Sequence, residues 1–335
     1  MIEDSVIHTS LLNEDPEYEN NIRPRSIDEF IGQERLVENL KIFIQAARER
    51  NEPLEHMLFY GPPGLGKTTL STIISREMQS QLHITSGPAI ERAGDLAALL
   101  TNLQAFDVLF IDEIHRLKSH VEEILYGAME DGVIDIMIGK GPTAKSMRID
   151  VAPFTLVGAT TRLSALSAPL RDRFGAIMKL DFYESNHMMR IVERSSQILG
   201  VTINSEASRI LGNCSRGTPR IANRLLRRMR DFAQVEKLSI IHEHFVINTL
   251  SKLHVDQYGL DNTDKQLLST LEYKFAGGPV GVSTLAAALS EEKMTIEEVY
   301  EPFLLQLGFI ERTARGRKIT QRGKEYIYQI NKKNS

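Results

Sequence analysis

The sequence predicts a parallel-sheet α/β domain, then an all-helical domain, then a small domain of three helices and a two-stranded hairpin. Three observations predict this order. Short apolar runs alternate with helical spacing from about residue 22 to 181, no convincing strand follows between about 182 and 254, and helices followed by a hairpin fill the remainder. The corresponding domains are 1–181, 182–254 and 255–335.

The strands of the first domain are expected at short apolar runs, of which Met57–Tyr60, Val108–Ile111 and Phe154–Val157 are the clearest. Because segments with helical spacing separate them, the strands favour a parallel sheet with helices on both faces. In the second domain the apolar residues of Met188–Ile198 and of Ile221–Met229 recur only at helical spacing.

The last domain begins after a change of pattern near residue 259. Asp261, Ser283 and Thr295 are each expected to cap a helix. Residues 308–310 and 317–320, separated by a short turn, are expected to form a two-stranded wing. Three helices and a wing make a winged helix, which is a variant of the helix-turn-helix plan.

The composition is typical of a folded protein, with 42% hydrophobic and 25% charged residues in 335 positions. Nothing approaches the roughly eighteen consecutive apolar residues of a membrane span. The acidic, polar segment 1–20 does not resemble a secretory signal. Cys214 is the only cysteine, which excludes an internal disulfide or a multi-cysteine zinc site, and a cytoplasmic location is expected.

Charge is distributed unevenly along the chain. A net charge of −4 argues against nucleic-acid binding by the whole protein surface. Residues 256–301 hold nine acidic side chains against three lysines, whereas residues 312–333 hold eight basic side chains and one acid. The second block is a candidate for phosphate contacts, and a solvated basic tail is the alternative.

The segment Gly61–Thr68 matches the phosphate-binding pattern G-x-x-x-x-G-K-[ST] and lies between an expected strand and an expected helix. Its glycines allow backbone N–H groups to surround phosphate oxygens, and the helix N-terminus adds its positive end. Lys67 is expected to reach the β- and γ-phosphates of ATP, and the Thr68 hydroxyl to bind Mg²⁺.

An apolar strand ends in two carboxylates at Asp112 and Glu113, the Walker B arrangement. Asp112 is expected to hold the magnesium shell and Glu113 to polarise a water for attack on the γ-phosphate. The two motifs together predict ATP hydrolysis. His115, on the next turn, is expected to be structural.

Three further polar residues suit such a site. Thr161 ends a strand-like run and would sense the γ-phosphate or orient water. Arg173 would project into a neighbouring subunit's site, and Arg220, which opens a helix of the second domain, would reach the γ-phosphate. Taken alone, each is more often structural, as a hydrogen-bonded threonine or an arginine in an ion pair, and their order relative to the phosphate loop favours the functional role.

The order of these motifs resembles that of AAA+ ATPases, and their amino-acid sequences are similar to those of the RuvB family of Holliday junction branch-migration motors. The resemblance extends from about residue 23 to 328. It rests on the segments Arg23–Arg25, Phe30–Gln33, Gly61–Leu70, Met129–Asp131, Asp135–Gly139, Gly158–Arg162, Pro169–Gly175, Gly217–Arg220 and Arg312–Arg317.

The resemblance implies a P-loop AAA+ ATPase domain, a small helical lid and a winged-helix head, with ATP and Mg²⁺ as cofactors. It implies that Arg173 is an arginine finger acting in trans and that Arg220 is a second sensor. The nucleotide contacts that it implies are Ile22, Arg23 and Tyr183 at the adenine, Gly61, Gly64, Leu65, Gly66, Lys67, Thr68 and Thr69 at the phosphates, and Glu130, Asp131 and Gly132 nearby. Gly132 stands where the family commonly has a bulkier residue, and residues 1–20 match nothing specific.

Residues 133–149 are expected to form a long hairpin whose outer face carries the apolar Ile136 and Ile138. An exposed apolar hairpin favours a protein partner, although packing on its own domain is the alternative. The resemblance implies that this hairpin docks on RuvA and that RuvC joins the larger complex.

The third helix of the head is expected to carry Glu297, Glu298 and Glu301 near its solvent face, which disfavours insertion into a major groove. The wing, with the basic residues Arg312, Arg315, Arg317 and Lys318, is the better DNA-facing element. Contacts to phosphates alone are independent of base sequence, which suits a homohexamer that encircles and moves along duplex DNA.

Other classes remain as alternatives. A clamp loader would need a helical collar and a replication initiator would need a base-reading helix. An unfoldase would need an aromatic pore loop, which the run after Asp112 and Glu113 lacks. A DNA-binding module with a vestigial nucleotide site conflicts with the complete set of catalytic residues.

Overall fold

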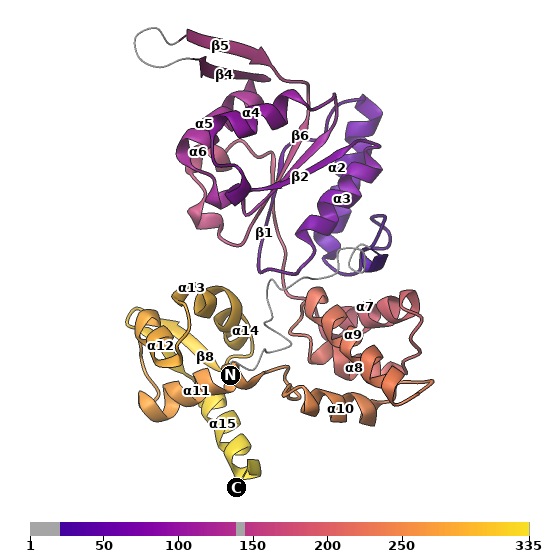
Figure 1. Ribbon diagram of the computed structural model, residues 1–335, viewed down its shortest axis with the longest axis vertical. Helices are drawn as coiled ribbons and strands as arrows, with labels where there is room; N and C mark the ends of the chain where they lie inside the picture. The colour runs from indigo at the N-terminus through magenta and orange to yellow at the C-terminus, as the bar shows by residue number, and fades with distance from the viewer. Residues whose placement is uncertain (1–20, 139–144, 335) are drawn as a thin grey trace. The chain divides into compact units, whose positions relative to one another are not determined.

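The computed structural model describes residues 21–138 and 145–334, which divide into two compact units (Figure 1). The first unit is Arg23–Asp181. The second unit consists of the chain from Phe182 onward together with the segment that ends at Ile22. No helix within these described residues is both long enough and apolar enough to cross a membrane.

A five-stranded parallel sheet forms the centre of the first unit, in the order β2-β3-β6-β1-β7. The predicted parallel sheet is therefore confirmed. Its strands are β1 Met57–Tyr60, β2 Leu82–Ser86, β3 Val108–Asp112, β6 Thr155–Thr160 and β7 Ala176–Lys179. The two edge strands, β2 and β7, are not among the clearest apolar runs, because β2 mixes polar with apolar residues and β7 offers only the three apolar residues Ala176–Met178.

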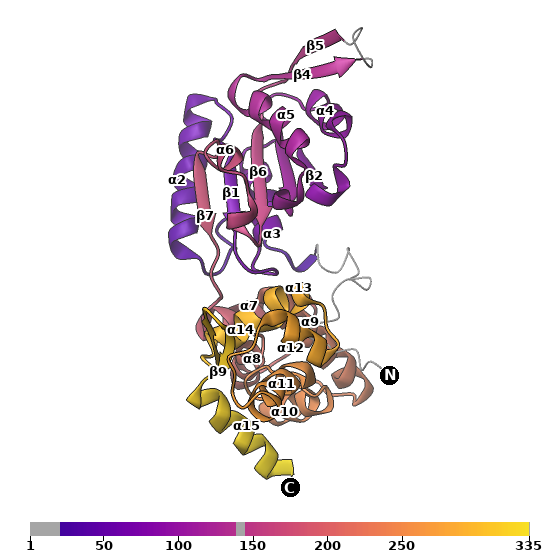
Figure 2. The same cartoon turned by 90° about the vertical axis from the view of Figure 1, so that its left-hand side faces the viewer.

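Helices cover both faces of this sheet, with α2 and α3 on one side and α4, α5 and α6 on the other (Figures 1 and 2). Their bounds are α2 Glu34–Arg50, α3 Lys67–Glu77, α4 Ala93–Thr101, α5 Ser119–Glu130 and α6 Ala168–Arg171. Short 3₁₀ turns lie at 87–89, 114–116 and 163–165.

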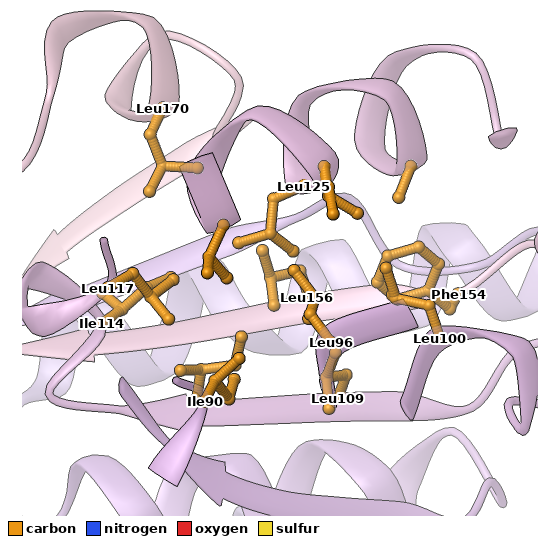
Figure 3. Packing of buried hydrophobic residues seen from close by; sticks show 14 of the residues in the cluster. Ile90, Leu96, Leu100, Leu109, Ile114, Leu117, Leu125, Phe154, Leu156 and Leu170 are labelled. Atoms are coloured by element: carbon orange, nitrogen blue, oxygen red, sulfur yellow. The ribbon is translucent and has the colours of Figure 1, made fainter. Parts of the chain in front are cut away.

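The second of these faces forms the core that holds the site in place. Leu109 and Leu156 of the sheet face leucines of all three covering helices, Leu96 and Leu100 of α4, Leu125 of α5 and Leu170 of α6 (Figure 3). All of these leucines are fully buried. Since each contributes about 1.5–3 kcal/mol through burial, α5 and α6 are fixed firmly against the sheet.

A separate antiparallel pair, β4 Val133–Ile138 and β5 Lys145–Asp150, extends beyond the helical layers (Figure 1). This confirms the predicted hairpin. Ile134 is buried in the core at its base, whereas Met147 is exposed. The predicted turn at 139–142 and the side chains of Ile136 and Ile138 lie outside the described residues.

The first part of the second unit is helical, as the sequence predicted: α7 Ser185–Ile198, α8 Ser205–Asn213, α9 Pro219–Val235 and α10 Glu243–Lys252. Among its described residues, extended pairing is confined to the isolated bridge between Ile203 and Ile241. Pro219 suits the first position of α9, where no intrahelical N–H donor is needed.

The remainder of this unit is a winged helix, which confirms the third predicted fold. Its elements are α11 Asn262–Ser269, α12 Val282–Leu289, α13 Lys293–Thr295, α14 Glu301–Gln306, β8 Ile310–Thr313, β9 Gly316–Ile319 and α15 Gln321–Asn334, with π turns at 270–274 and 296–300. The strands β8 and β9 form the predicted wing.

One of the three predicted helix caps is correct. The Asp261 side chain accepts a hydrogen bond from the Asp264 amide at the start of α11. Ser283 and Thr295 do not cap their helices, because the backbone has already become helical after Gly281 and Glu292, which take the extended conformation of a cap residue.

A buried arginine joins the helical part to the winged helix. The guanidinium of Arg216, which is 2% exposed, donates to the Gly259 carbonyl at 2.7 Å and to the Asp264 carboxylate. It also lies 5.3 Å from the ring centre of Phe303. Burial raises the pKa of Asp264 to about 7, and the adjacent carboxylate of Asp261 acts in the same direction, against the lowering effect of Arg216. The helical part and the winged helix are therefore in contact through a buried, charged side chain.

Candidate nucleotide and DNA sites

Three predicted site segments meet at one edge of the sheet. The glycine-rich loop follows β1, the residues Asp112 and Glu113 end or follow β3, and Thr161 follows β6. Strand β6 pairs in parallel with both β1 and β3, so the carboxyl ends of all three strands are neighbours. Ligands of open parallel sheets bind at this edge.

The loop after β1 has the backbone of a phosphate cradle. Gly61 has a φ of 145°, and a Cβ atom there would lie 2.4 Å from the Leu180 carbonyl oxygen, so only glycine fits. Gly66 precedes α3 with a φ of 107°, and no side chain caps that helix. The first N–H groups of α3 are therefore available to donate to a phosphate bound at this end of the helix.

Lys67 bends back over the loop. Its Nζ donates to the Gly61 carbonyl at 2.7 Å and to the Pro62 carbonyl at 2.8 Å, and the side chain is buried. Leu65 is fully buried beneath the loop, and Thr68 begins the same helix turn as Lys67. Backbone N–H groups, a lysine and a hydroxyl thus come from one loop and the first turn of the helix after it, and this set of groups fits a nucleoside triphosphate.

The two carboxylates of Walker B differ in geometry. The Asp112 Oδ1 accepts the Glu113 amide at 2.9 Å, and Glu113 takes a left-handed φ of 51°, which turns its side chain away from the line of the strand. The Glu113 Oε2 lies 3.7 Å from Nε2 of His115. The other ring nitrogen of His115 lies 2.9 Å from Oγ1 of Thr160.

His115 is thus a site residue that the sequence pattern did not indicate. It connects the candidate base Glu113 to the end of β6, next to Thr161. A single histidine two residues after Glu113 gives no signal of this in the sequence, because the contact depends on β3 and β6 being neighbours.

Thr161 lies one residue beyond β6, since that strand ends at Thr160 rather than at Thr161 itself. Its Oγ1 is buried and has no hydrogen-bond partner among the described residues. A buried hydroxyl without a partner is uncommon and fits a group that bonds to a ligand.

Arg173 lies against its own chain. Its Nη1 donates to the Pro169 carbonyl at 2.7 Å, and its Nη2 donates to Glu130 Oε2 at 2.8 Å. The guanidinium carbon lies 4.5 Å from the ring centre of Tyr126. Asp131 follows as the C-cap of α5, and Gly132 continues with a φ of 64°.

The predicted adenine and sensor residues are divided between the units. Ile22 and Tyr183 are buried in the second unit, where Arg194 donates to the Ile22 carbonyl at 2.6 Å. Arg23 belongs to the first unit. Arg220 is exposed near the start of α9. Their assignment to the nucleotide stays a prediction.

The wing arginines are tied to one acidic side chain. Arg312 Nε donates to Glu301 Oε1 at 2.6 Å, and Arg317 donates to both oxygens of Glu301 at 2.9 Å and to Glu297 at 3.1 Å. Arg315 is exposed at the turn. Burial raises the pKa of Glu301, but the hydrogen bonds and charges of Arg312 and Arg317 outweigh it, so the pKa lies below its ordinary value.

The expectation that Glu301 lies near the solvent face is wrong, since this residue is 0% exposed. The cause is the π turn at 296–300, which holds more residues than an α turn. Glu301 consequently faces the interior, as does Ile296, five residues earlier. Glu297 and Glu298 are half-buried.

A phosphate loop after β1, paired carboxylates after β3 and a hydroxyl after the strand between them, followed by a helical domain, define an AAA+ ATPase. Family models agree, and together they match nearly the whole chain. The Holliday junction DNA helicase RuvB P-loop domain matches residues 22–180, the RuvB AAA lid domain matches 183–256, and the RuvB C-terminal winged-helix domain matches 257–328.

Curated relatives carry the name Holliday junction branch migration complex subunit RuvB. The chain is 58% identical to the protein of Chloroflexus aurantiacus over 315 residues, covering 94% of this chain and 90% of the relative. It is 55% identical to the protein of Dehalococcoides mccartyi over 332 residues, covering 98% and 95%. The chain belongs to the RuvB family.

Solved structures agree. The Thermotoga maritima RuvB Holliday junction branch migration motor is similar with a TM-score of 0.85 and 47% identity, covering 92% of this chain and 98% of that one. A single-residue variant of the same Thermotoga protein gives a TM-score of 0.85 at 48% identity, with the same coverage of 92% and 98%.

Proposed function

We infer that this chain is an AAA+ ATPase that uses ATP hydrolysis to drive branch migration of Holliday junctions in recombination and repair. The observation that carries this inference is the convergence of three motifs at one sheet edge in a chain whose three domains all match the RuvB family. The clamp-loader and initiator alternatives lack this support, because the winged-helix domain itself matches the RuvB family.

The triphosphate would lie on the loop 61–68. Lys67 would exchange its two loop carbonyls for β- and γ-phosphate oxygens, and the first N–H groups of α3 would bind the β-phosphate. Thr68 and Asp112 would hold Mg²⁺, which would supply positive charge to the triphosphate.

Hydrolysis needs a base and a sensor of the γ-phosphate. Glu113, turned out of the strand line, would orient the attacking water. The free hydroxyl of Thr161 would bond to the γ-phosphate or to that water. His115 would keep Glu113 and the end of β6 in register.

The other nucleotide contacts are proposals that rest on the family resemblance. Arg173 would act on the γ-phosphate of the ATP bound to the neighbouring subunit of a homohexamer. Arg220 would sense the γ-phosphate of the ATP bound to its own subunit. The adenine contacts would come from the three residues Ile22, Arg23 and Tyr183, and the remaining nucleotide contacts from Gly64, Thr69, Asp131 and Gly132.

The wing would hold DNA by its backbone through Arg312, Arg315 and Arg317, so that binding is independent of base sequence. The buried Arg216 supports transfer of motion from the lid to this head, because a change at either side of that contact would expose a buried charge. The hairpin 133–149 would dock on RuvA, with RuvC in the larger complex. We place this assembly in the cytoplasm.

A synthetic four-way junction tests the function. With ATP and RuvA, the full chain is expected to dissociate junctions built from two unrelated sequences at similar rates. The matched control is Lys67→Ala, which should bind DNA but leave both junctions intact, because the role proposed for Lys67 is at the nucleotide and not at the DNA. Intact ATPase activity without junction dissociation, with and without RuvA, would contradict the proposal.

A further inference from the structure

Arg173 is held on three sides by its own subunit. The Pro169 carbonyl accepts from one terminal nitrogen, the Glu130 carboxylate accepts from the other, and the ring of Tyr126 lies against the flat face of the guanidinium. Its side chain is only 22% exposed. A surface arginine without such contacts samples many rotamers, so this one is restricted before any second subunit is present.

The ring of Tyr126 is itself fixed. Its hydroxyl donates to Glu122 Oε2 at 3.1 Å and lies 3.1 Å from Oγ of Ser167. Ser167 caps α6, where it accepts from the Leu170 amide at 3.3 Å, and α6 leads directly into Arg173. Burial raises the pKa of Tyr126 above its ordinary value of 10, so this hydroxyl is protonated at neutral pH and able to donate.

The contacts leave a defined part of the guanidinium available. Of its five N–H groups, one is given to Pro169 and one to Glu130, and Nε is buried without a partner among the described residues. Each terminal nitrogen thus retains one N–H. Each of these two remaining donors is able to donate to a phosphate oxygen.

We propose that Glu130 and Tyr126 are positioning residues for Arg173, which hold its two remaining donors in the orientation that a neighbouring subunit's γ-phosphate requires. This inference rests on the proposed action of Arg173 in trans. Glu130 then acts through Arg173, in place of the direct nucleotide contact that the family resemblance implies for it.

The reason for such an arrangement is preorganisation. An arginine that is already oriented loses little rotational freedom when the phosphate arrives, so its charge acts fully on the transition state. The pair contributes little to folding, because the Glu130 side chain is 56% exposed to water. The ion pair between Glu130 and Arg173 therefore serves to orient Arg173.

The test uses the full chain with duplex DNA and compares Glu130→Gln with the wild type. The kcat for ATP is expected to fall about tenfold, within the range that displacement of a catalytic group produces, while the KM for ATP and the melting temperature stay unchanged. Glu123→Gln is the matched control, since Glu123 is an exposed glutamate of the same helix. An unchanged or raised kcat in Glu130→Gln would overturn the proposal.

A second readout asks whether Glu130 acts through Arg173. The affinity for ADP with aluminium fluoride, which imitates the phosphoryl group in transfer, should fall by the same factor as kcat, while the affinity for ADP alone stays constant. In an Arg173→Ala background, Glu130→Gln should cause no further loss. A further loss there would mean that Glu130 touches the nucleotide, and the proposal would be wrong.

Tyr126 gives an independent check. Tyr126→Phe keeps the ring beneath the guanidinium and Tyr126→Leu removes it, so the leucine variant should lose about threefold or more in kcat relative to the phenylalanine variant. Equal rates would remove Tyr126 from the proposal. A normal rate of ATP hydrolysis in Arg173→Ala would instead contradict the proposed action of Arg173 in trans. The experiments thus distinguish failure of that proposed function from failure of the positioning role of Glu130 and Tyr126.

Discussion

Two arginine sites in this molecule have the same chemistry in opposite surroundings. Arg173 pairs with Glu130, whose side chain is 56% exposed, whereas Arg312 and Arg317 pair with Glu301, which is 0% exposed. The side chain of Arg317 is itself 14% exposed. An exposed pair of this kind contributes about 0–1 kcal/mol to stability, but removal of one member of a buried pair costs about 3–5 kcal/mol.

The difference separates two uses of a glutamate beside a functional arginine. In our proposal, Glu130 of the ATPase unit orients an arginine that must still reach the nucleotide of another subunit. At the wing, Glu301 joins α14 to both strands of the hairpin, so it holds the fold of the surface that would meet DNA. Substitutions at the first site should therefore change rates, and substitutions at the second should change stability first.

The largest effect is expected at Arg173. Because a trans arginine stabilises charge on the transferring phosphoryl group, Arg173→Ala should lower the ATPase kcat by about 10³-fold or more. Nucleotide binding, measured by fluorescence of a labelled ATP analogue, should be retained. Arg48→Ala on the exposed side of α2 is the matched control and should behave as wild type. A normal rate in Arg173→Ala would rule out its proposed role.

Next in size is Glu301→Ala, which leaves Arg317 in a largely enclosed position without its main partner. The free energy of unfolding of the second unit should fall by about 3–5 kcal/mol in chemical denaturation. Glu311→Gln, which breaks the exposed pair with Lys318 at 3.3 Å, should cost less than about 1 kcal/mol. Equal losses from the two variants would contradict the distinction between buried and exposed pairs.

The pH dependence of the same pair follows from the lowered pKa of Glu301. A carboxyl group whose pKa is lower in the folded state stabilises that state above its ordinary pKa of about 4.5, and this contribution is lost as the pH falls below that value. The stability difference between wild type and Glu301→Gln should therefore be constant near neutral pH and shrink as the solution is acidified from pH 4.5. A difference that grows in acid would mean that the pKa is raised.

The smallest effect is expected for Arg315→Ala. Loss of one phosphate contact at the exposed turn should weaken duplex binding only a few-fold, equally for unrelated sequences, and reduce the salt dependence of binding by about one charge. Fluorescence anisotropy over a salt series measures both. A loss confined to one sequence would indicate base contacts and would exclude a purely backbone-binding wing.

The sequence predicted the architecture well, because its signals are local. The apolar runs at β1, β3 and β6, the glycines of the phosphate loop and the wing hairpin each depend on residues close in the chain. The same locality identified Lys67, Asp112 and Glu113. The edge strands β2 and β7 give a weaker signal, because β2 mixes polar with apolar residues and the apolar run of β7 is only three residues long.

What could not be predicted depends on distant contacts or on irregular backbone. The link from Glu113 through His115 to Thr160 requires β3 and β6 to be neighbours. The contact of Glu130 with Arg173 joins residues 43 positions apart on α5 and after α6. The direction of Glu301 depends on a π turn, which helical spacing does not anticipate.

The most direct measurement of the central claim is the ATPase rate per subunit over a dilution series, with and without duplex DNA of arbitrary sequence. If Arg173 completes the ATPase site of a neighbouring subunit, the rate per subunit rises steeply with protein concentration as rings assemble. If the wing binds the DNA backbone, a duplex of any sequence raises the rate further. A rate that stays constant on dilution and does not respond to DNA would contradict the account.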